Sequence, residues 1–143
     1  MKKILPILLA CLIPLAATAQ ITVKGKMSYK TVKSIRMGYV KVTQADDRFY
    51  LVLKSTNDFE ESLMVKLGTG AEQAAQTMDG IVQLFDAIDG GVTTFSTPDG
   101  KSHDVTRGSF GNMYFLVENT AGPYIMGKGE AKQCAAAIAK VKQ

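Results

Sequence analysis

The chain has 143 residues, with 17 basic and 13 acidic side chains, one histidine, two cysteines and no tryptophan. Its net charge of +4 falls to +2 if Lys2 and Lys3 leave with a signal peptide, so we expect no nucleic-acid partner. One histidine, and one cysteine beyond residue 20, leave no basis for a histidine-cluster metal site or an internal disulfide.

The first twenty residues have the layout of a bacterial secretory signal peptide. A basic start at residues 1–3 is followed by an almost wholly apolar run at 4–17, and small residues at 17–19 precede a cleavage site at Gln20. The apolar run is too short for a comfortable bilayer span. We therefore expect residues 1–19 to be a signal peptide and the protein to be periplasmic or secreted, with no transmembrane span in the mature chain.

A lipoprotein is the alternative interpretation of the same segment. Residues 8–11 (Leu-Leu-Ala-Cys) resemble a lipobox, whose cysteine, here Cys11, is lipidated and becomes the first mature residue. Only residues 4–10 would then form the apolar core of the signal. The segment after Cys11 is also apolar, whereas lipoprotein tethers are usually polar. The soluble interpretation is favoured for these reasons.

The mature chain begins with residues that alternate strictly between apolar and polar. Over residues 21–30 this pattern suits a strand with one buried and one solvated face. Further strands are predicted at 35–43, with Gly38 as a bulge, at 48–54 and at 63–67.

The spacing of the apolar residues then changes to three and four positions, which predicts a helix over 70–89. Thr69 and Glu72 have the spacing of a capping box at its start. Gly80 inside the helix suggests a close approach to the sheet. In the second half, the pattern predicts strands at 92–96, 103–110, 113–117 and 124–126, and a last helix from about Glu130.

The two halves of this pattern can be overlaid. Residues 48–56 resemble residues 112–120, and each stretch is followed by a turn, a short strand, a Gly-x-Gly sequence and an alanine-rich helix. We therefore predict an α+β fold, in which a largely antiparallel sheet, or two continuous half-sheets, has two helices on one face. The domain at 20–143 would contain tandem β-β-β-α halves at 20–91 and 92–143. Coincidence between two similar successions of elements is the alternative.

Few residues in the chain offer catalytic chemistry. His103 has Asp104 beside it, but neighbours on a strand face opposite ways, so an exposed, non-catalytic histidine is favoured. Cys134 lies on the apolar face of the last predicted helix, which favours a buried side chain. We expect no enzymatic activity, no cofactor and no metal site.

A basic N-terminal stretch is the strongest candidate for a binding site. Lys24, Lys26 and Lys30 share one face of the first predicted strand, and no acidic residue lies between Lys24 and Lys41. Such a row can meet a lipid headgroup, an acidic glycan or an acidic protein surface. Protection of an exposed edge strand against pairing is the simpler interpretation.

These observations favour an exported, non-catalytic binding or interaction module of the bacterial envelope, whose partner is an unknown protein or envelope component. The alternative is a small-ligand or lipid carrier with a pocket between the sheet and the helices. A deep apolar cavity would favour the carrier, whereas a filled core with an exposed aromatic patch would favour the interaction module. A pair between His103 and a carboxylate inside a cleft would favour an enzyme.

Overall fold

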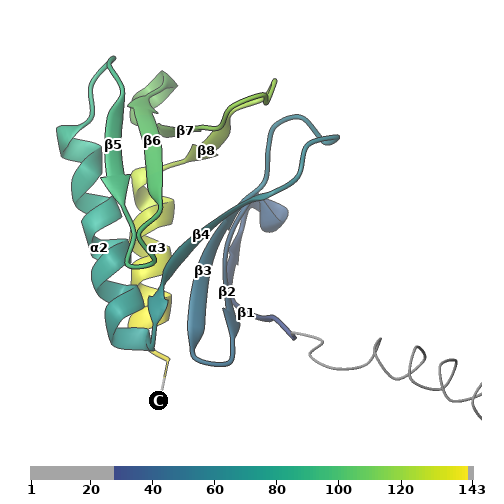
Figure 1. Ribbon diagram of the computed structural model, residues 1–143, viewed down its shortest axis with the longest axis vertical. Helices are drawn as coiled ribbons and strands as arrows, with labels where there is room; N and C mark the ends of the chain where they lie inside the picture. The colour runs from purple at the N-terminus through teal and green to yellow at the C-terminus, as the bar shows by residue number, and fades with distance from the viewer. Residues whose placement is uncertain (1–27, 142–143) are drawn as a thin grey trace, which may run out of the picture.

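The computed structural model describes residues 28–141, which form two antiparallel four-stranded sheets and two α-helices (Figure 1). Sheet A contains, in chain order, β1 (Lys30–Ile35), β2 (Val40–Ala45), β3 (Arg48–Leu53) and β4 (Leu63–Thr69). Sheet B contains β5 (Thr93–Ser96), β6 (Ser102–Arg107), β7 (Met113–Leu116) and β8 (Tyr124–Met126). The helices are α2 (Ala71–Ala87) and α3 (Lys128–Ala139). The predicted α+β class is confirmed.

The two helices pack against each other and lie on one side of sheet A, with α2 next to β4 and α3 next to β1 and β2 (Figure 1). One cluster of buried apolar side chains joins both sheets to both helices; it includes Leu51, Phe85, Phe115 and Ile138. The side of sheet A that faces the helices is therefore filled by the core.

Within residues 28–141, each half of the fold contains four strands followed by one α-helix. β3 and β7, which carry the sequence similarity between the halves, both occupy the third place in their sheets. The sheets meet where Ser55 pairs with Tyr124 in an isolated bridge. The element order is consistent with tandem units, and a common origin of the two halves stays a prediction.

The single strand predicted over 35–43 is wrong, because the chain turns between β1 and β2 at η1 (Arg36–Gly38). Arg36, Met37 and Gly38 have positive φ angles of 51°, 56° and 91°, and this left-handed backbone cannot continue a strand. Met37 continues the apolar alternation in the sequence, yet its side chain is fully exposed at the tip of the turn.

A similar turn shortens the strand predicted over 103–110. β6 ends at Arg107, and η2 (Ser109–Gly111) holds Phe110 at a φ of 59° with its side chain fully exposed. The strand predicted over 21–30 lies mostly outside the described residues, and only its last residue, Lys30, belongs to β1.

The start of α2 also differs from the prediction. Its N-cap is Gly70, and the capping box of Thr69 and Glu72 does not form. Instead, the side-chain carbonyl of Gln73 accepts a hydrogen bond of 2.8 Å from the backbone N–H of Thr69. The carbonyl of Asp47 accepts one of 2.6 Å from the N–H of Gly70, which ties the helix to the β2–β3 turn.

Gly80 does not mark a close approach of α2 to a sheet. A Cβ atom built at this position would have no other atom within 4 Å. Glycine in a helix interior is less favourable than alanine by about 1 kcal/mol. We therefore expect Gly80→Ala to raise the free energy of unfolding by about 0.5–1 kcal/mol in urea denaturation. A destabilised variant would show that this position needs glycine for a reason the fold does not display.

Candidate binding surface

Two of the three predicted binding residues, Lys24 and Lys26, lie outside the described residues. Lys30 begins β1 opposite Gln44 of β2, so its side chain belongs to the helix side of sheet A. There it lines an open groove of about 600 Å³ together with Ala137 and Lys140 of the C-terminal region. The structure therefore does not bring Lys30 into the group of cations described next.

The opposite side of sheet A carries another group of cations. Val42, Leu51 and Val65 are cross-strand neighbours whose fully buried side chains face the helices. The residues that alternate with them point away from the helices. We call this side the open face; its central side chains are Lys41, Tyr50, Val52, Met64 and Lys66.

The open face has an unbalanced positive charge. The four strands of sheet A contain lysine and arginine but no aspartate or glutamate. Lys41 lies across from Val52, and Lys66 lies across from Tyr50, so each lysine has an uncharged cross-strand neighbour on β3. Neither lysine forms an ion pair with any residue that the structure describes.

Two further cations border the open face at opposite ends of β3. The guanidinium of Arg48 lies 3.7 Å from the carboxylate of Asp46, and the ammonium of Lys54 lies 3.9 Å from that of Asp58. Both carboxylates are in turns and well exposed. Exposed pairs at such distances contribute little, about 0–1 kcal/mol. The cations at the centre of the open face are therefore Lys41 and Lys66.

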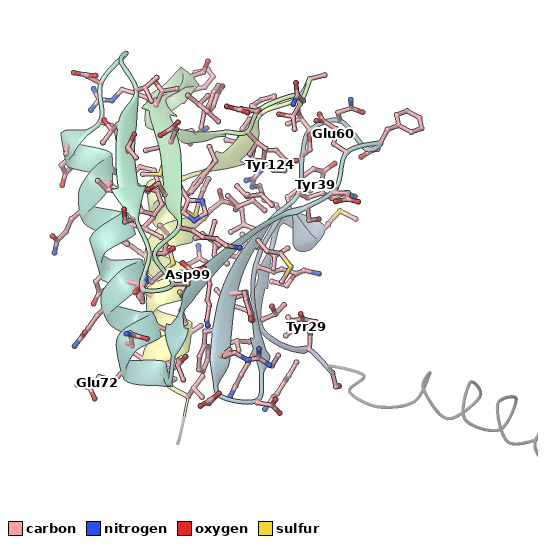
Figure 2. The ribbon with its side chains drawn as sticks, in the orientation of Figure 1. Tyr29, Tyr39, Glu60, Glu72, Asp99 and Tyr124 are labelled. Carbon is pink, nitrogen blue, oxygen red and sulfur yellow. The ribbon has the colours of Figure 1, made fainter. Side chains whose placement is uncertain are left out.

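Three tyrosines accompany these cations. Tyr29 and Tyr39 lie on the side of sheet A away from the helices (Figure 2). The ring of Tyr29, 48% exposed, meets that of Tyr50 edge to face at 6.0 Å between centroids. The ring of Tyr39 lies 5.1 Å from the ammonium of Lys54 and 5.9 Å from the guanidinium carbon of Arg36. The face is thus a mixed surface of aromatic rings and cations.

Arg36 anchors one end of this surface to α3 and β8. Its Nη2 donates to the carbonyl of Ile125 at 2.9 Å and to Oε1 of Glu130 at 3.0 Å, while its Nε donates to Oε2 of Glu130. Glu130 Oε1 also accepts a bond of 2.8 Å from the N–H of Gly127, at the start of α3. Arg36 and Glu130 are far apart in the sequence, which offered no signal for this contact.

His103 is not the exposed histidine that the sequence predicts. It is partly buried, its ring lies 5.4 Å from that of Phe95, and its Nε2 is buried with no hydrogen-bond partner among the described residues. Asp104 instead accepts a bond of 2.6 Å from the hydroxyl of Thr94. Within residues 28–141, no carboxylate forms a hydrogen bond or an ion pair with His103.

The buried position of His103 predicts a dependence of stability on pH. Burial lowers its pKa; Lys101 acts in the same direction, and the attraction of Asp99 and Asp104 opposes both. The folded protein thus favours the neutral ring. The contribution of His103 to the free energy of unfolding is therefore fully present above the unfolded pKa of about 6.5. It is lost as the pH decreases from there through the folded pKa.

A glutamine at position 103 cannot be protonated in this range, so His103→Gln should remove that loss. We expect the unfolding free energy of the wild type, minus that of the variant, to be larger at about pH 7.5 than at about pH 5. Urea denaturation at both pH values measures the difference. An equal free-energy difference at the two pH values would show that protonation of His103 does not cause the loss of stability at low pH.

Cys134 is fully buried, as the sequence predicts, and burial raises the pKa of its thiol to about 11. A thiol with this pKa is almost entirely protonated near neutral pH and is a poor nucleophile. Among residues 28–141, no group of three or more His, Cys, Asp or Glu side chains is placed to hold a metal ion.

Two open grooves lie on the surface of the described residues. The first is the groove at Lys30. The second, of about 450 Å³, lies between α2 and the β5–β6 hairpin and is lined by Ile81, Leu84 and Phe95. Within the described part of the chain, no helix is long and apolar enough to cross a membrane.

Comparison of the chain with protein-family models, with curated proteins and with solved structures found no match. The functional interpretation therefore rests on the geometry and charge of the open face.

Proposed function

We propose that the protein is an exported, non-catalytic binding module that holds an anionic component of the bacterial envelope on the open face of sheet A. One observation carries this proposal: Lys41 and Lys66 project from a sheet face without carboxylates, and neither is neutralised by the described chain. An uncompensated patch of one sign attracts and orients a partner of the opposite sign. Export is supported by the signal layout of residues 1–19.

The filled core supports a binding module over a carrier. A carrier needs an enclosed apolar pocket between sheet and helices. The side chains at the centre of that space are closely packed: Val42, Leu51, Leu67 and Met78 are all fully buried. The groove between β1 and α3 is open, and Lys30 and Lys140 are among the residues that line it. The chemistry available supports binding without turnover, since Nε2 of His103 has no hydrogen-bond partner in the described part of the chain and the thiol of Cys134 is inaccessible.

Charge reversal on the open face tests the proposal. We expect Lys41→Glu combined with Lys66→Glu to reduce capture of the envelope component by at least about tenfold, because each lost charged contact is worth about 1.5–3 kcal/mol. Capture by the wild type should weaken as salt rises, since exposed charges are screened over about 10 Å at 0.1 M. Capture from envelope extract by the immobilised protein gives both results.

The matched control is Lys101→Glu combined with Lys132→Glu, which changes the net charge equally at exposed positions in the β5–β6 turn and on α3. Thermal unfolding is the measurement that checks whether both double variants are folded. Equal capture by the two double variants would contradict an open-face site.

A further inference from the structure

We infer that the ligand of the open face is an acidic polysaccharide, a chain of sugar rings carrying carboxylates. This inference rests on the proposed function, because it identifies the partner of the same surface. It is carried by the groups beside the cations: Ser34 lies across from Lys41 and Tyr50 across from Lys66, so each lysine has a hydroxyl-bearing neighbour. The apolar side chain between the two lysines, Val52, is only 7% exposed.

The hydroxyl groups form a continuous row across the sheet. Thr31, Thr43 and Tyr50 are successive cross-strand neighbours on β1, β2 and β3, and the row ends at Lys66 on β4. In the parallel row, Ser34 lies next to Lys41. The hydroxyl of Thr43 is buried, so a ligand lying on this face meets Thr31 and Ser34, which are exposed, and Tyr50, which is half-buried. Hydroxyls both donate and accept, as sugar hydroxyls do.

A protein partner fits this composition less well. The cores of protein–protein interfaces are depleted in lysine and serine and are enriched in apolar and aromatic area. Here the central apolar residue, Val52, is only 7% exposed, which leaves Met64, at 44%, as the main exposed apolar side chain of the centre. A protein docked on this face would bury lysines and hydroxyls in place of an apolar anchor.

Single-stranded nucleic acid also fits less well. Its binding proteins offer successive free ring faces on which bases stack. On the open face, cations already lie over the ring of Tyr39, and Tyr29 and Tyr50 contact each other edge to face. Hydrogen bonds to hydroxyls and ion pairs to carboxylates do not require free ring faces.

The positions of the lysines indicate a ligand with several anionic groups. Lys41 is on β2 and Lys66 is on β4, two strands away, and Lys54 follows β3 at one end of the face. Cations on β2, on β4 and just after β3 match a polymer with repeated carboxylates better than a single small anion. An extended acidic glycan lying across β2, β3 and β4 would meet both lysines and the hydroxyl row.

The test is calorimetric titration of the protein with polygalacturonate oligomers. Polyglutamate supplies carboxylates without sugar hydroxyls, dextran supplies sugar hydroxyls without charge, and single-stranded DNA supplies phosphates and bases. We expect polygalacturonate to bind most tightly. The double change Lys41→Glu and Lys66→Glu should weaken it by about tenfold or more, and Tyr50→Phe, which removes one hydroxyl, by about three- to tenfold.

Equal affinity for polyglutamate, together with an unchanged affinity in Tyr50→Phe, would overturn the glycan assignment, and so would tighter binding of single-stranded DNA. Failure of polygalacturonate to bind would also overturn it. In each case the proposed function survives if capture from envelope extract still depends on Lys41 and Lys66. Capture that is independent of these two lysines overturns the proposed function itself.

Discussion

Replacement of Glu60 by alanine should lower the free energy of unfolding by about 3 kcal/mol. The carboxylate of Glu60, in the β3–β4 loop, accepts hydrogen bonds from the N–H groups of Gly122 at 2.7 Å and Ala121 at 3.1 Å, and from the hydroxyl of Ser55 at 3.2 Å. It thereby joins the loop of one sheet to the β7–β8 loop of the other. Removing the carboxylate leaves two backbone donors without their partner at the junction of the sheets.

Glu61→Ala is the matched control. The carbonyl of Glu61 accepts a bond of 2.6 Å from the hydroxyl of Tyr124, and alanine keeps this carbonyl. Figure 2 shows Glu60 and Tyr124 in the same corner of the molecule. Urea denaturation of both variants should separate them by more than about 2 kcal/mol. Equal stabilities would mean that the carboxylate of Glu60 does not hold the loops together.

Phe115→Ala should cost about 3–5 kcal/mol, the usual loss for a large buried aromatic residue. Its side chain is 2% exposed and belongs to the core cluster. It meets the ring of Phe95 edge to face, with 6.1 Å between centroids, and lies between Val105 and Tyr124 in sheet B. The cavity left by alanine would remove packing contacts between sheet B and the rest of the core.

The next residue on the same strand provides the comparison. Leu116 points to the other side of sheet B and is 44% exposed, so Leu116→Ala should cost less than about 1 kcal/mol. Thermal unfolding followed by circular dichroism measures both variants. Similar losses for Phe115→Ala and Leu116→Ala would show that the two sides of β7 are wrongly assigned.

The sequence predicts the elements in which the arrangement of apolar residues matches the arrangement of buried residues. Apolar residues on both faces predict β3, and the helical period of Ala74, Met78, Ile81 and Phe85 predicts α2; all four of these residues are buried. The period cannot locate the turns at Met37 and Phe110, because both residues are apolar and fully exposed. Their positive φ angles are a property of the backbone that no apolar pattern reveals.

The candidate surface could be predicted only in part. The basic character of the stretch up to Lys41 is visible in the sequence, but the side of the sheet that each lysine takes is not. A register shift between Thr31 and Lys33 and the turn after Ile35 both interrupt the simple alternation. Lys66 joins Lys41 on the open face only through the pairing of β2, β3 and β4, which is a long-range feature of the fold.

Lysine footprinting of the bound protein tests the central claim most directly. The protein, free and with its captured envelope component, is acetylated briefly, and the rate at each lysine is read by mass spectrometry. The open-face site predicts that Lys41 and Lys66 become several-fold less reactive in the complex, while Lys101 and Lys132 keep their rates. Protection of Lys101 or Lys132 with unchanged reactivity at Lys41 and Lys66 would contradict it.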